Sequence, residues 1–287
     1  MSIHRGIVDA RWLRAHRNDR DVTVIDVRWS MQPPTGRERY GSGHIEGAHY
    51  LDLDSQLSRP VEEGPGRHPL PTPEALAEAL ASVGIDRQMT VVCYDDRGGA
   101  IAARLWWLLR FYGAPVEAVI LDGGVQAWTG LGEALSTTVP EVKRVEPMSL
   151  AAREWMVIDR AGVQEALKSG AVVLDARGRN RYRGEIEPID PRAGHIPGSL
   201  NAPYADNLRA SHGPLLPLED LREHYEALGA LGDRDVICSC GSGVTACHDI
   251  WALNLLGRTN TKLYEGSWSD WSSDDSLPAA TGPEPGG

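Results

Sequence analysis

The sequence predicts an α/β fold with two tandem domains, each a mainly parallel sheet flanked by helices. The chain has 287 residues, and this length favours two domains with substantial hydrophobic cores. Short apolar runs alternate with helical patterns along it, which is typical of parallel strands joined by helices. The same order of elements occurs in both halves, so we interpret the chain as a duplicated unit.

Three short apolar runs in the first half are predicted as buried parallel strands, because they lack the strict alternation of a half-exposed strand. They are Val22–Ile25, Thr90–Tyr94 and Glu117–Leu121.

Helical patterns separate these strands. Over Pro73–Val83 a helix is favoured by the proline in its first turn and by Gly84 directly after its end. Further helices are expected over Val8–His16, over Gly99–Tyr112 and around Trp128.

Four segments of the first half return in the second half, at separations of 143 to 151 residues. The matched pairs are Val22–Arg28 with Ala171–Arg177, Gly43–Ala48 with Gly194–Ser199, Val91–Asp95 with Val236–Cys240, and Asp122–Trp128 with Glu265–Trp271. A repeat of this size indicates duplication of a whole domain and not a solenoid.

Composition places the domain boundaries. The segment after Gly130 has mixed polarity, two prolines and no clear periodicity, so we expect domains at 1–135 and 153–287 joined by a linker at 136–152. From about residue 272 the chain is rich in serine, aspartate, proline and glycine, and we expect a mobile tail there.

Charge and composition exclude several classes of protein. A formal net charge of -11 argues against general binding to nucleic acid and to anionic membranes. No stretch approaches the length of a spanning helix, and the first six residues lack the apolar core of a signal peptide, so we expect a cytoplasmic protein. Four cysteines are too few for a disulfide scaffold in a chain of this length.

The strongest candidate for chemistry is Cys240, in the segment C-G-S-G-V-T that follows the predicted strand Val236–Cys238. Gly241 and Gly243 allow the backbone to curl, so that N–H groups face inward at the start of the next helix. Ser242 and Thr245 add hydroxyl groups. Such surroundings favour a thiolate, and we predict that Cys240 is a catalytic nucleophile.

The internal repeat predicts that this nucleophile occurs once per chain, because Asp95 takes the matching position in the first copy. A buried free cysteine in a tight turn is the plain structural alternative. Zinc is disfavoured because Cys238, Cys240, Cys247 and His248 show no paired C-x-x-C spacing, and we expect no metal. Cys238 and Cys247 are interpreted as core thiols.

A phosphatase of related loop design is also disfavoured. Such enzymes use C-x5-R, in which the arginine clamps the phosphate, whereas the sixth residue after Cys240 is Ala246. An anion-binding arginine is instead expected in the loop Gly178–Gly184, at the carboxyl edge of the second sheet.

Polar residues that recur in the two halves have structural interpretations. We interpret Asp26 with Arg28, and Asp175 with Arg177, as ion pairs that follow the strands. His44 and His195 are expected to brace the two G-H-I-x-G turns, and His44 is a further candidate for the pocket.

These motifs resemble the tandem-domain rhodanese family of sulfurtransferases. The resemblance extends from about Val8 to Trp271 and is carried by G-H-I-P-G, R-Y-R-G, C-G-S-G-V-T and G-S-W-S-D-W. It implies two rhodanese-like domains, of which the N-terminal copy is non-catalytic and the C-terminal copy carries Cys240.

The resemblance also implies a reaction. The loop C-G-S-G-V-T is that of members acting on 3-mercaptopyruvate, which implies a persulfide on Cys240, no other cofactor, and cyanide, a thiol or thioredoxin as acceptor. Thiosulfate is the alternative donor, and a non-enzymatic persulfide carrier or interaction module is the alternative of another class.

The resemblance implies several substrate-binding residues. Arg181 is carried over as the arginine that binds the donor carboxylate, and Ser242 with His44 as a hydroxyl–imidazole relay. The second arginine of those enzymes falls at Asp190 here, with Arg192 close by as a further candidate. The predicted substrate-binding set is Arg181, Gly241, Ser242, Gly243, Val244, Thr245, His44 and Arg192.

Overall fold

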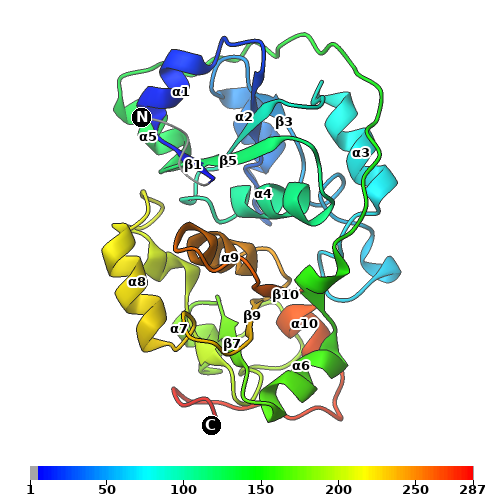
Figure 1. Cartoon of the computed structure of the whole chain (residues 1–287), viewed down its shortest axis with the longest axis vertical. Helices are drawn as coiled ribbons and strands as arrows, with labels where there is room; N and C mark the ends of the chain where they lie inside the picture. The colour runs from blue at the N-terminus through cyan, green and yellow to red at the C-terminus, as the bar shows by residue number, and fades with distance from the viewer. Residues whose placement is uncertain (1–5, 287) are drawn as a thin grey trace. The chain divides into compact units, whose positions relative to one another are not determined.

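The computed structural model describes residues 6–286, which form two units (Figure 1). Unit 1 comprises Met1–Arg59, Pro71–Arg153 and Leu208–Leu215, and unit 2 comprises Pro60–Leu70, Glu154–Asn207 and Leu216–Gly287. The N-terminal segment without a signal-peptide core lies outside the described residues, apart from its last residue, Gly6.

Unit 1 is built on a five-stranded parallel sheet with the strand order β1-β5-β4-β2-β3. Its strands are β1 Ile7–Val8, β2 Val22–Asp26, β3 His49–Tyr50, β4 Thr90–Tyr94 and β5 Glu117–Leu121. In the centre, Val24 pairs with Val92 and Val92 with Val119, and all three side chains are buried. Burial of the central strands explains why they read as continuous apolar runs.

The helices of unit 1 begin at local capping signals. Asp9 caps α1 (Ala10–His16), Thr35 and Glu38 form a capping box at α2 (Gly36–Ser42), and Thr72 caps α3 (Pro73–Ser82). The remaining helices are α4 Ala102–Phe111 and α5 Gly124–Gly130. The helix predicted from Val8 begins two residues later, because Val8 pairs with Leu121 as part of β1.

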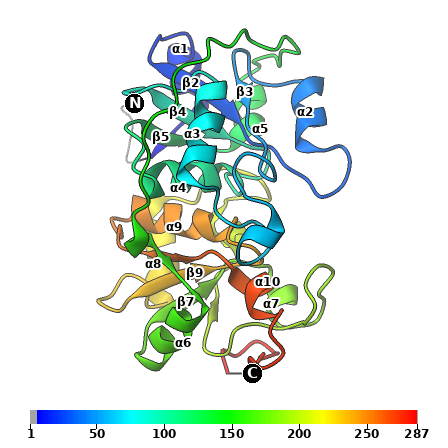
Figure 2. The same ribbon diagram turned by 90° about the vertical axis from the view of Figure 1, so that its right-hand side faces the viewer.

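Unit 2 repeats this architecture, with a five-stranded parallel sheet in the order β6-β10-β9-β7-β8 (Figure 2). Its strands are β6 Val157–Ile158, β7 Val172–Asp175, β8 Leu200–Asn201, β9 Val236–Ser239 and β10 Lys262–Tyr264. Its helices are α6 Arg160–Lys168, α7 Arg179–Tyr182, α8 Leu218–Ala227, α9 Ala246–Leu255 and α10 Ser267–Trp271. Short 3-10 turns are η1 Val61–Glu63, η2 Glu154–Met156 and η3 Tyr204–Asn207.

The equivalent strand orders confirm the predicted α/β fold with two parallel sheets. Corresponding helices also fill corresponding cores. Trp12 and Trp128, from α1 and α5, pack on the sheet of unit 1, and Trp268 and Trp271, from α10, pack on that of unit 2.

The predicted ion pairs follow β2 and β7, as expected. Arg28 binds Asp26 through Nε and Nη2 and donates to the carbonyl of Gly43, and Arg177 binds Asp175 in the same way and donates to that of Gly194. Each pair therefore ties the end of a strand to a G-H-I-x-G turn.

The domain limits differ from the contiguous division expected from composition. The expected linker packs with unit 1, where the N–H groups of Ala151 and Arg153 donate to the carbonyls of Tyr112 and Phe111. In addition, Pro60–Leu70 belongs to unit 2. Composition describes only local polarity, so it cannot predict that a segment of the first half packs with the second half.

The C-terminal segment is a second correction, because it is held down where mobility was expected. The guanidinium group of Arg192 donates to the carbonyls of Trp271, Ser272, Asp274 and Leu277 at 2.8 to 3.1 Å. Further on, Ala280 and His195 exchange backbone hydrogen bonds, and Pro285 accepts from the N–H of Gly198. Polar composition predicted a loose tail, but its carbonyl groups are the ligands of a partly buried cation.

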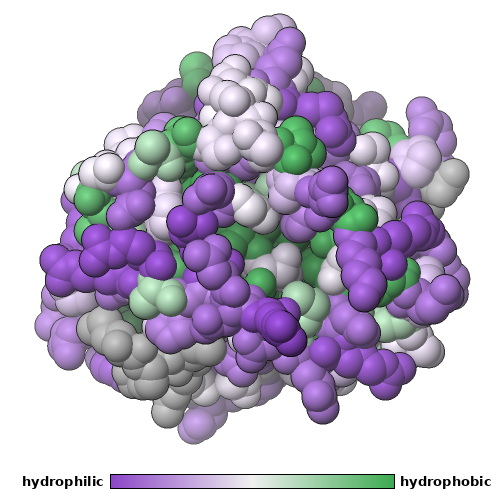
Figure 3. Space-filling view, turned by 90° about the horizontal axis from the view of Figure 1, so that it is seen from above, coloured by the Kyte–Doolittle hydropathy of each residue, from purple (hydrophilic) through white to green (hydrophobic). Residues whose placement is uncertain are grey.

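No helix within residues 6–286 is long and apolar enough to cross a membrane. Figure 3 shows one face of the surface, on which most side chains are hydrophilic.

The Arg192 contacts predict the effect of removing that cation. Arg192→Gln should release the segment after Trp271 and lower the free energy of unfolding by about 2 kcal/mol, since hydrogen bonds to charged groups contribute roughly 1.5–3 kcal/mol. Limited proteolysis should then cut within residues 272–286 of the variant before the wild-type protein is cut. Equal cleavage rates and equal denaturation midpoints of the variant and the wild-type protein would show that Arg192 does not hold the C-terminal segment.

Candidate active site

Cys240 lies directly after β9 and before α9, at the carboxyl edge of the parallel sheet where α/β proteins bind ligands. Its side chain is buried, and its backbone is fixed from α10. The N–H of Cys240 donates to Ser267 Oγ at 3.0 Å, and its carbonyl accepts from the N–H of Trp268 at 3.0 Å. The carbonyl of Gly241 accepts from the N–H of Ser269 at 2.9 Å. The thiol is therefore carried on a backbone that has little freedom.

Ser267 adopts a left-handed backbone conformation, with a φ of 52°, that non-glycine residues rarely adopt. Its hydroxyl donates to the carbonyl of Tyr264 at 2.9 Å and accepts from Cys240. The matching residue of unit 1, Gly124, has a φ of 53°. Unit 2 keeps this conformation although a serine replaces the glycine. The serine hydroxyl group then holds the peptide of Cys240.

The matching turn of unit 1 shows what such a loop binds. Both carboxylate oxygens of the buried Asp95 accept backbone N–H groups, at distances of 2.7 to 2.9 Å. The four donors are Arg97, Gly99, Ile101 and Ala102. The turn is therefore a nest around a negative charge on the first residue after the strand.

Ser242 and Val244 are the equivalents of Arg97 and Gly99 in unit 2. Within residues 6–286 the N–H groups of Ser242 and Val244 have no hydrogen-bond acceptor. They are available to an anion on Cys240, as their counterparts are to Asp95. Gly243 is required by the turn, because its φ is +73° and a Cβ there would lie 2.5 Å from the carbonyl oxygen of Glu265.

The segment Pro60–Leu70 brings two further side chains to this loop. Gly66, with a φ of +71°, packs so closely that a Cβ would lie 2.6 Å from the carbonyl oxygen of Gly266. Next to it, the N–H of Arg67 donates to Ser269 Oγ at 3.2 Å. His68 is buried, and its Nδ1 lies 2.7 Å from Ser242 Oγ. An imidazole and a hydroxyl group thus meet in the loop that follows Cys240.

Two arginines lie next to the same loop. Arg181, from α7, binds Glu187 through Nε and Nη2 at 3.2 and 2.7 Å, and Asp190 through Nη2 at 2.9 Å. Arg67 forms an ion pair with the other oxygen of Asp190. Burial and the neighbouring positive charge of Arg181 lower the pKa of Arg67.

The structure corrects the roles expected for His44 and Arg192. His44 is fully buried in unit 1, where it stacks on Tyr40 and its two ring nitrogens face the carbonyls of Tyr40 and Thr138 at 2.8 and 3.1 Å. The imidazole that contacts Ser242 belongs to His68 instead. Arg192 holds the C-terminal segment, so its guanidinium is already occupied.

Sequence reasoning missed Arg67 and His68. The available signal was G-P-G-R-H-P-L-P at residues 64–71, a turn-rich segment with a guanidinium and an imidazole side by side. Its location in the first half hid its membership of unit 2. By contrast, Arg181 Nη1 lies beside Gly241, the residue after Cys240, and its role in binding the donor stays a prediction.

The other cysteines of unit 2 are core residues. Cys238 is fully buried, and burial raises the pKa of its thiol. Cys247 is also buried, and its thiol donates to the carbonyl of Gly243 at 3.3 Å. Among the residues that the structure describes, no three His, Cys, Asp or Glu side chains lie close enough to hold a metal ion.

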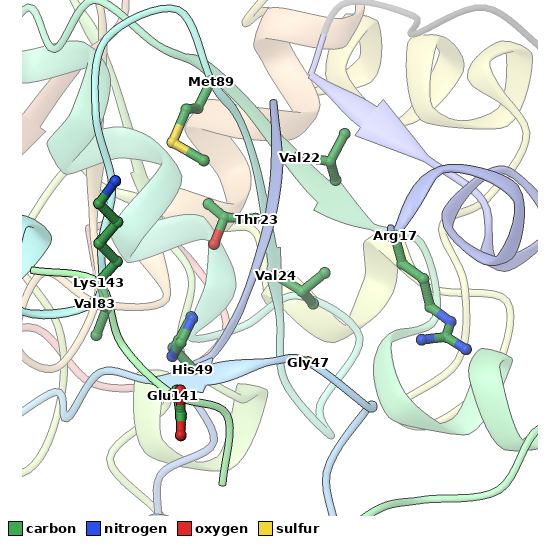
Figure 4. A pocket seen from close by; sticks show the side chains of 11 residues that line it. Arg17, Val22, Thr23, Val24, Gly47, His49, Val83, Met89, Glu141 and Lys143 are labelled. Carbon is green, nitrogen blue, oxygen red and sulfur yellow. The ribbon is translucent and has the colours of Figure 1, made fainter. Parts of the chain in front are cut away.

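A separate cavity of about 250 Å³ lies in unit 1 (Figure 4). Val22, Thr23 and Val24 of β2 line it, together with His49 and Lys143. Burial lowers the pKa of His49, which favours the neutral ring. No cysteine lines this cavity.

A buried carboxyl group lies in the first turn of α9. Asp249 is fully buried, and its Oδ1 accepts from Asn207 Nδ2 at 2.9 Å and from the hydroxyl group of Tyr225 at 3.2 Å. Its Oδ2 has no partner among the described residues. Burial raises the pKa of Asp249 well above its usual value, because desolvation outweighs these two hydrogen bonds.

The arrangement defines a class of protein: a duplicated α/β fold in which the turn after the central strand carries a carboxylate in one copy and a thiol in the other. The rhodanese-like domain family matches residues 9–131 and 159–274. The chain therefore belongs to the rhodanese family, in two tandem copies.

Named relatives match almost the whole chain. A probable 3-mercaptopyruvate sulfurtransferase from Pseudomonas aeruginosa is 43% identical over 281 residues, covering 96% of this chain and 98% of that protein. A putative thiosulfate sulfurtransferase, SseB, from Mycobacterium tuberculosis is 37% identical and covers 91% of each. The crystal structure of the 3-mercaptopyruvate sulfurtransferase SseA from Escherichia coli matches with a TM-score of 0.80 and 33% identity, over 92% of this chain and 98% of that one. These matches confirm the predicted enzyme class, a sulfurtransferase.

The buried Asp249 predicts a dependence of stability on pH. Its pKa is higher in the folded than in the unfolded protein, so its contribution to stability is present at low pH and is lost as pH rises toward the folded-state value. Asp249→Asn removes this loss and retains an amide oxygen for Asn207 and Tyr225. Between pH 5 and pH 8 the free energy of unfolding of the variant should therefore rise relative to wild type, by at most about 1.4 kcal/mol per pH unit. Urea denaturation at both pH values measures this, and a constant difference would contradict it.

Proposed function

We propose that the protein transfers sulfur from 3-mercaptopyruvate to a thiophilic acceptor through a persulfide on Cys240. The observation that carries the proposal is the turn after β9, in which a thiol, unused N–H groups and two guanidinium groups lie together. A thiolate formed there, and the persulfide anion that replaces it, would accept those N–H groups.

In the first half-reaction the Cys240 thiolate attacks the sulfur atom of the donor. An S–S bond forms, the C–S bond breaks, and its electron pair leaves as the enolate of pyruvate. A proton then passes to the enolate carbon, which yields pyruvate and a persulfide on Cys240. Arg181 binds the carboxylate of the donor, since its guanidinium is fixed beside the loop.

Ser242 and His68 are placed to move that proton. The Oγ–Nδ1 distance of 2.7 Å is a hydrogen bond, and both groups are buried next to the thiol-bearing residue. In the proposed role the pair takes the proton of the donor thiol and returns it to the enolate carbon.

In the second half-reaction an acceptor attacks the outer sulfur and restores the Cys240 thiolate. Cyanide, a small thiol and reduced thioredoxin have the required affinity for sulfur, and we propose that the cycle takes place in the cytoplasm. The covalent persulfide carries the sulfur, so the reaction requires no separate cofactor.

Thiosulfate is the second candidate donor, and a relative named as a putative thiosulfate sulfurtransferase favours testing it. The residues directly after Cys240 are small and uncharged, from Gly241 to Thr245. A dianion would meet no basic side chain within that segment, so we favour the monocarboxylate donor. Steady-state kcat/KM values for the two donors decide between them, and a clear preference for thiosulfate would reverse this order.

Replacement of Cys240 tests the covalent step. Intact mass should show an increase of about 32 Da, one sulfur atom, on the wild-type protein after incubation with 3-mercaptopyruvate, and no increase on Cys240→Ala. Cys247→Ala is the matched control, because that thiol lies on α9 and donates to a backbone carbonyl. Loading of Cys240→Ala with sulfur would refute the assignment. Loading of the wild-type protein without turnover would instead indicate a persulfide carrier.

Replacement of His68 tests the proton relay. His68→Gln should lower kcat for 3-mercaptopyruvate by roughly 100-fold with little change in KM, the usual scale for loss of general acid–base catalysis. The variant should also lose the part of the pH–rate profile that follows imidazole titration. His44→Gln, in unit 1, is the comparison that separates loss of a relay from loss of a structural histidine. An unchanged kcat in His68→Gln would remove this residue from the mechanism.

A further inference from the structure

Two guanidinium groups converge on the peptide that follows the thiol. A Cβ placed on Gly241 would lie 3.0 Å from Arg67 Nη2 and 3.4 Å from Arg181 Nη1. The two arginines come from segments far apart in the sequence, yet both belong to unit 2. Because residue 241 is a glycine, the space between the two guanidinium groups and the loop stays open. A side chain at this position would contact both guanidinium groups.

Asp190 and Glu187 hold these groups from the opposite side. The two oxygens of Asp190 accept one N–H each from Arg67 Nη1 and Arg181 Nη2, and the Asp190 side chain is 2% exposed. Glu187 binds Nε and Nη2 of Arg181. The nitrogens that point to Gly241, Arg67 Nη2 and Arg181 Nη1, donate to no recorded acceptor within residues 6–286. Each arginine is thus oriented by carboxylates while one nitrogen faces the loop.

We propose that Arg67 Nη2 and Arg181 Nη1 form a two-armed site for the carboxylate of the sulfur donor, and that Asp190 positions both arms. This inference rests on the proposed function and names a specificity-determining residue, Arg67, for that reaction. A carboxylate has two oxygens, so it can accept one N–H from each arm, as it does in a fork of two parallel hydrogen bonds.

The charges around the arms set the kind of anion that fits. Arg67, Arg177 and Arg181 are balanced by three buried carboxylates, those of Asp175, Glu187 and Asp190. A donor with a single negative charge adds one charge to a neutral cluster, whereas a dianion adds two. Asp190 therefore favours a monocarboxylate over a dianion such as thiosulfate, because it already uses part of the positive charge of both arms.

The test compares two donors that differ only in the carboxylate. 3-Mercaptopyruvate carries it, and mercaptoacetone is the same α-mercaptoketone with a methyl group in its place. Arg67→Gln should lower the rate of Cys240 loading from dilute 3-mercaptopyruvate by roughly 10- to 100-fold, the effect of losing one charge-assisted hydrogen bond. Loading from mercaptoacetone, followed by intact mass in a single turnover, should change less than about twofold. Arg67→Lys should recover part of the loss.

Arg179→Gln is the matched control, since Arg179 lies on α7 two residues from Arg181 but pairs with Asp206 at the surface. It should load at the wild-type rate from both donors. Asp190→Asn gives an independent readout: the ratio of thiosulfate to 3-mercaptopyruvate loading should rise by about tenfold or more.

The inference is overturned if Arg67→Gln slows both donors equally, which would indicate a structural role, or if it slows neither. It is also overturned if Asp190→Asn leaves the donor ratio unchanged. Failure of the proposed function is separate and is seen first, because the wild-type protein would then gain no sulfur from 3-mercaptopyruvate. Thermal unfolding of each variant shows whether it is folded under the conditions of the loading assay.

Discussion

Between β9 and α9 the peptides pair neither with a strand nor within a helix, and the arrangement around Cys240 depends on how their polar groups are satisfied. Up to Ser239 the peptides pair with β7, and from Ala246 they belong to a helix. The peptides between them lie in a buried environment, where an unpaired N–H group is costly. The fold holds this segment from α10 through Ser267 and Trp268. Among the described residues, the N–H groups of Ser242 and Val244 have no protein acceptor in this turn.

The two copies of the domain satisfy this turn in different ways. In unit 1 the carboxylate of Asp95 accepts four backbone N–H groups and completes the turn. In unit 2 the matching residue is a thiol, so a charge is present only as a thiolate or a persulfide. The same turn therefore holds a carboxylate in one unit and a thiol in the other.

Local pattern was sufficient to predict the elements and the thiol. The strands, the glycine-bearing turn and the start of α9 all follow from residues within a few positions of Cys240. His68 was beyond that reach, since its contact with Ser242 spans 174 residues of sequence. Local sequence also led to the wrong role for His44, because a G-H-I-x-G turn does not reveal that its imidazole stacks on Tyr40. It also hid the role of Arg192, whose acceptors are backbone carbonyls with no signature in side-chain composition.

A continuous set of ion pairs connects the sheet of unit 2 to the active-site loop. Asp175, at the end of β7, binds Arg177, which contacts Glu187; Glu187 in turn binds Arg181. Such buried charges cost desolvation energy, and their net contribution to stability is often small. Their consequence here is geometric.

The chain of pairs ends at Asp190, which binds both Arg181 and Arg67. Arg67 is also fixed through Ser269, whose N–H holds the carbonyl of Gly241. The same short helix, α10, therefore positions the peptide beside the thiol and the segment that supplies the imidazole and the second guanidinium. A change in α10 would move Cys240 and the Pro60–Leu70 segment together, so the distances among these groups depend on few elements.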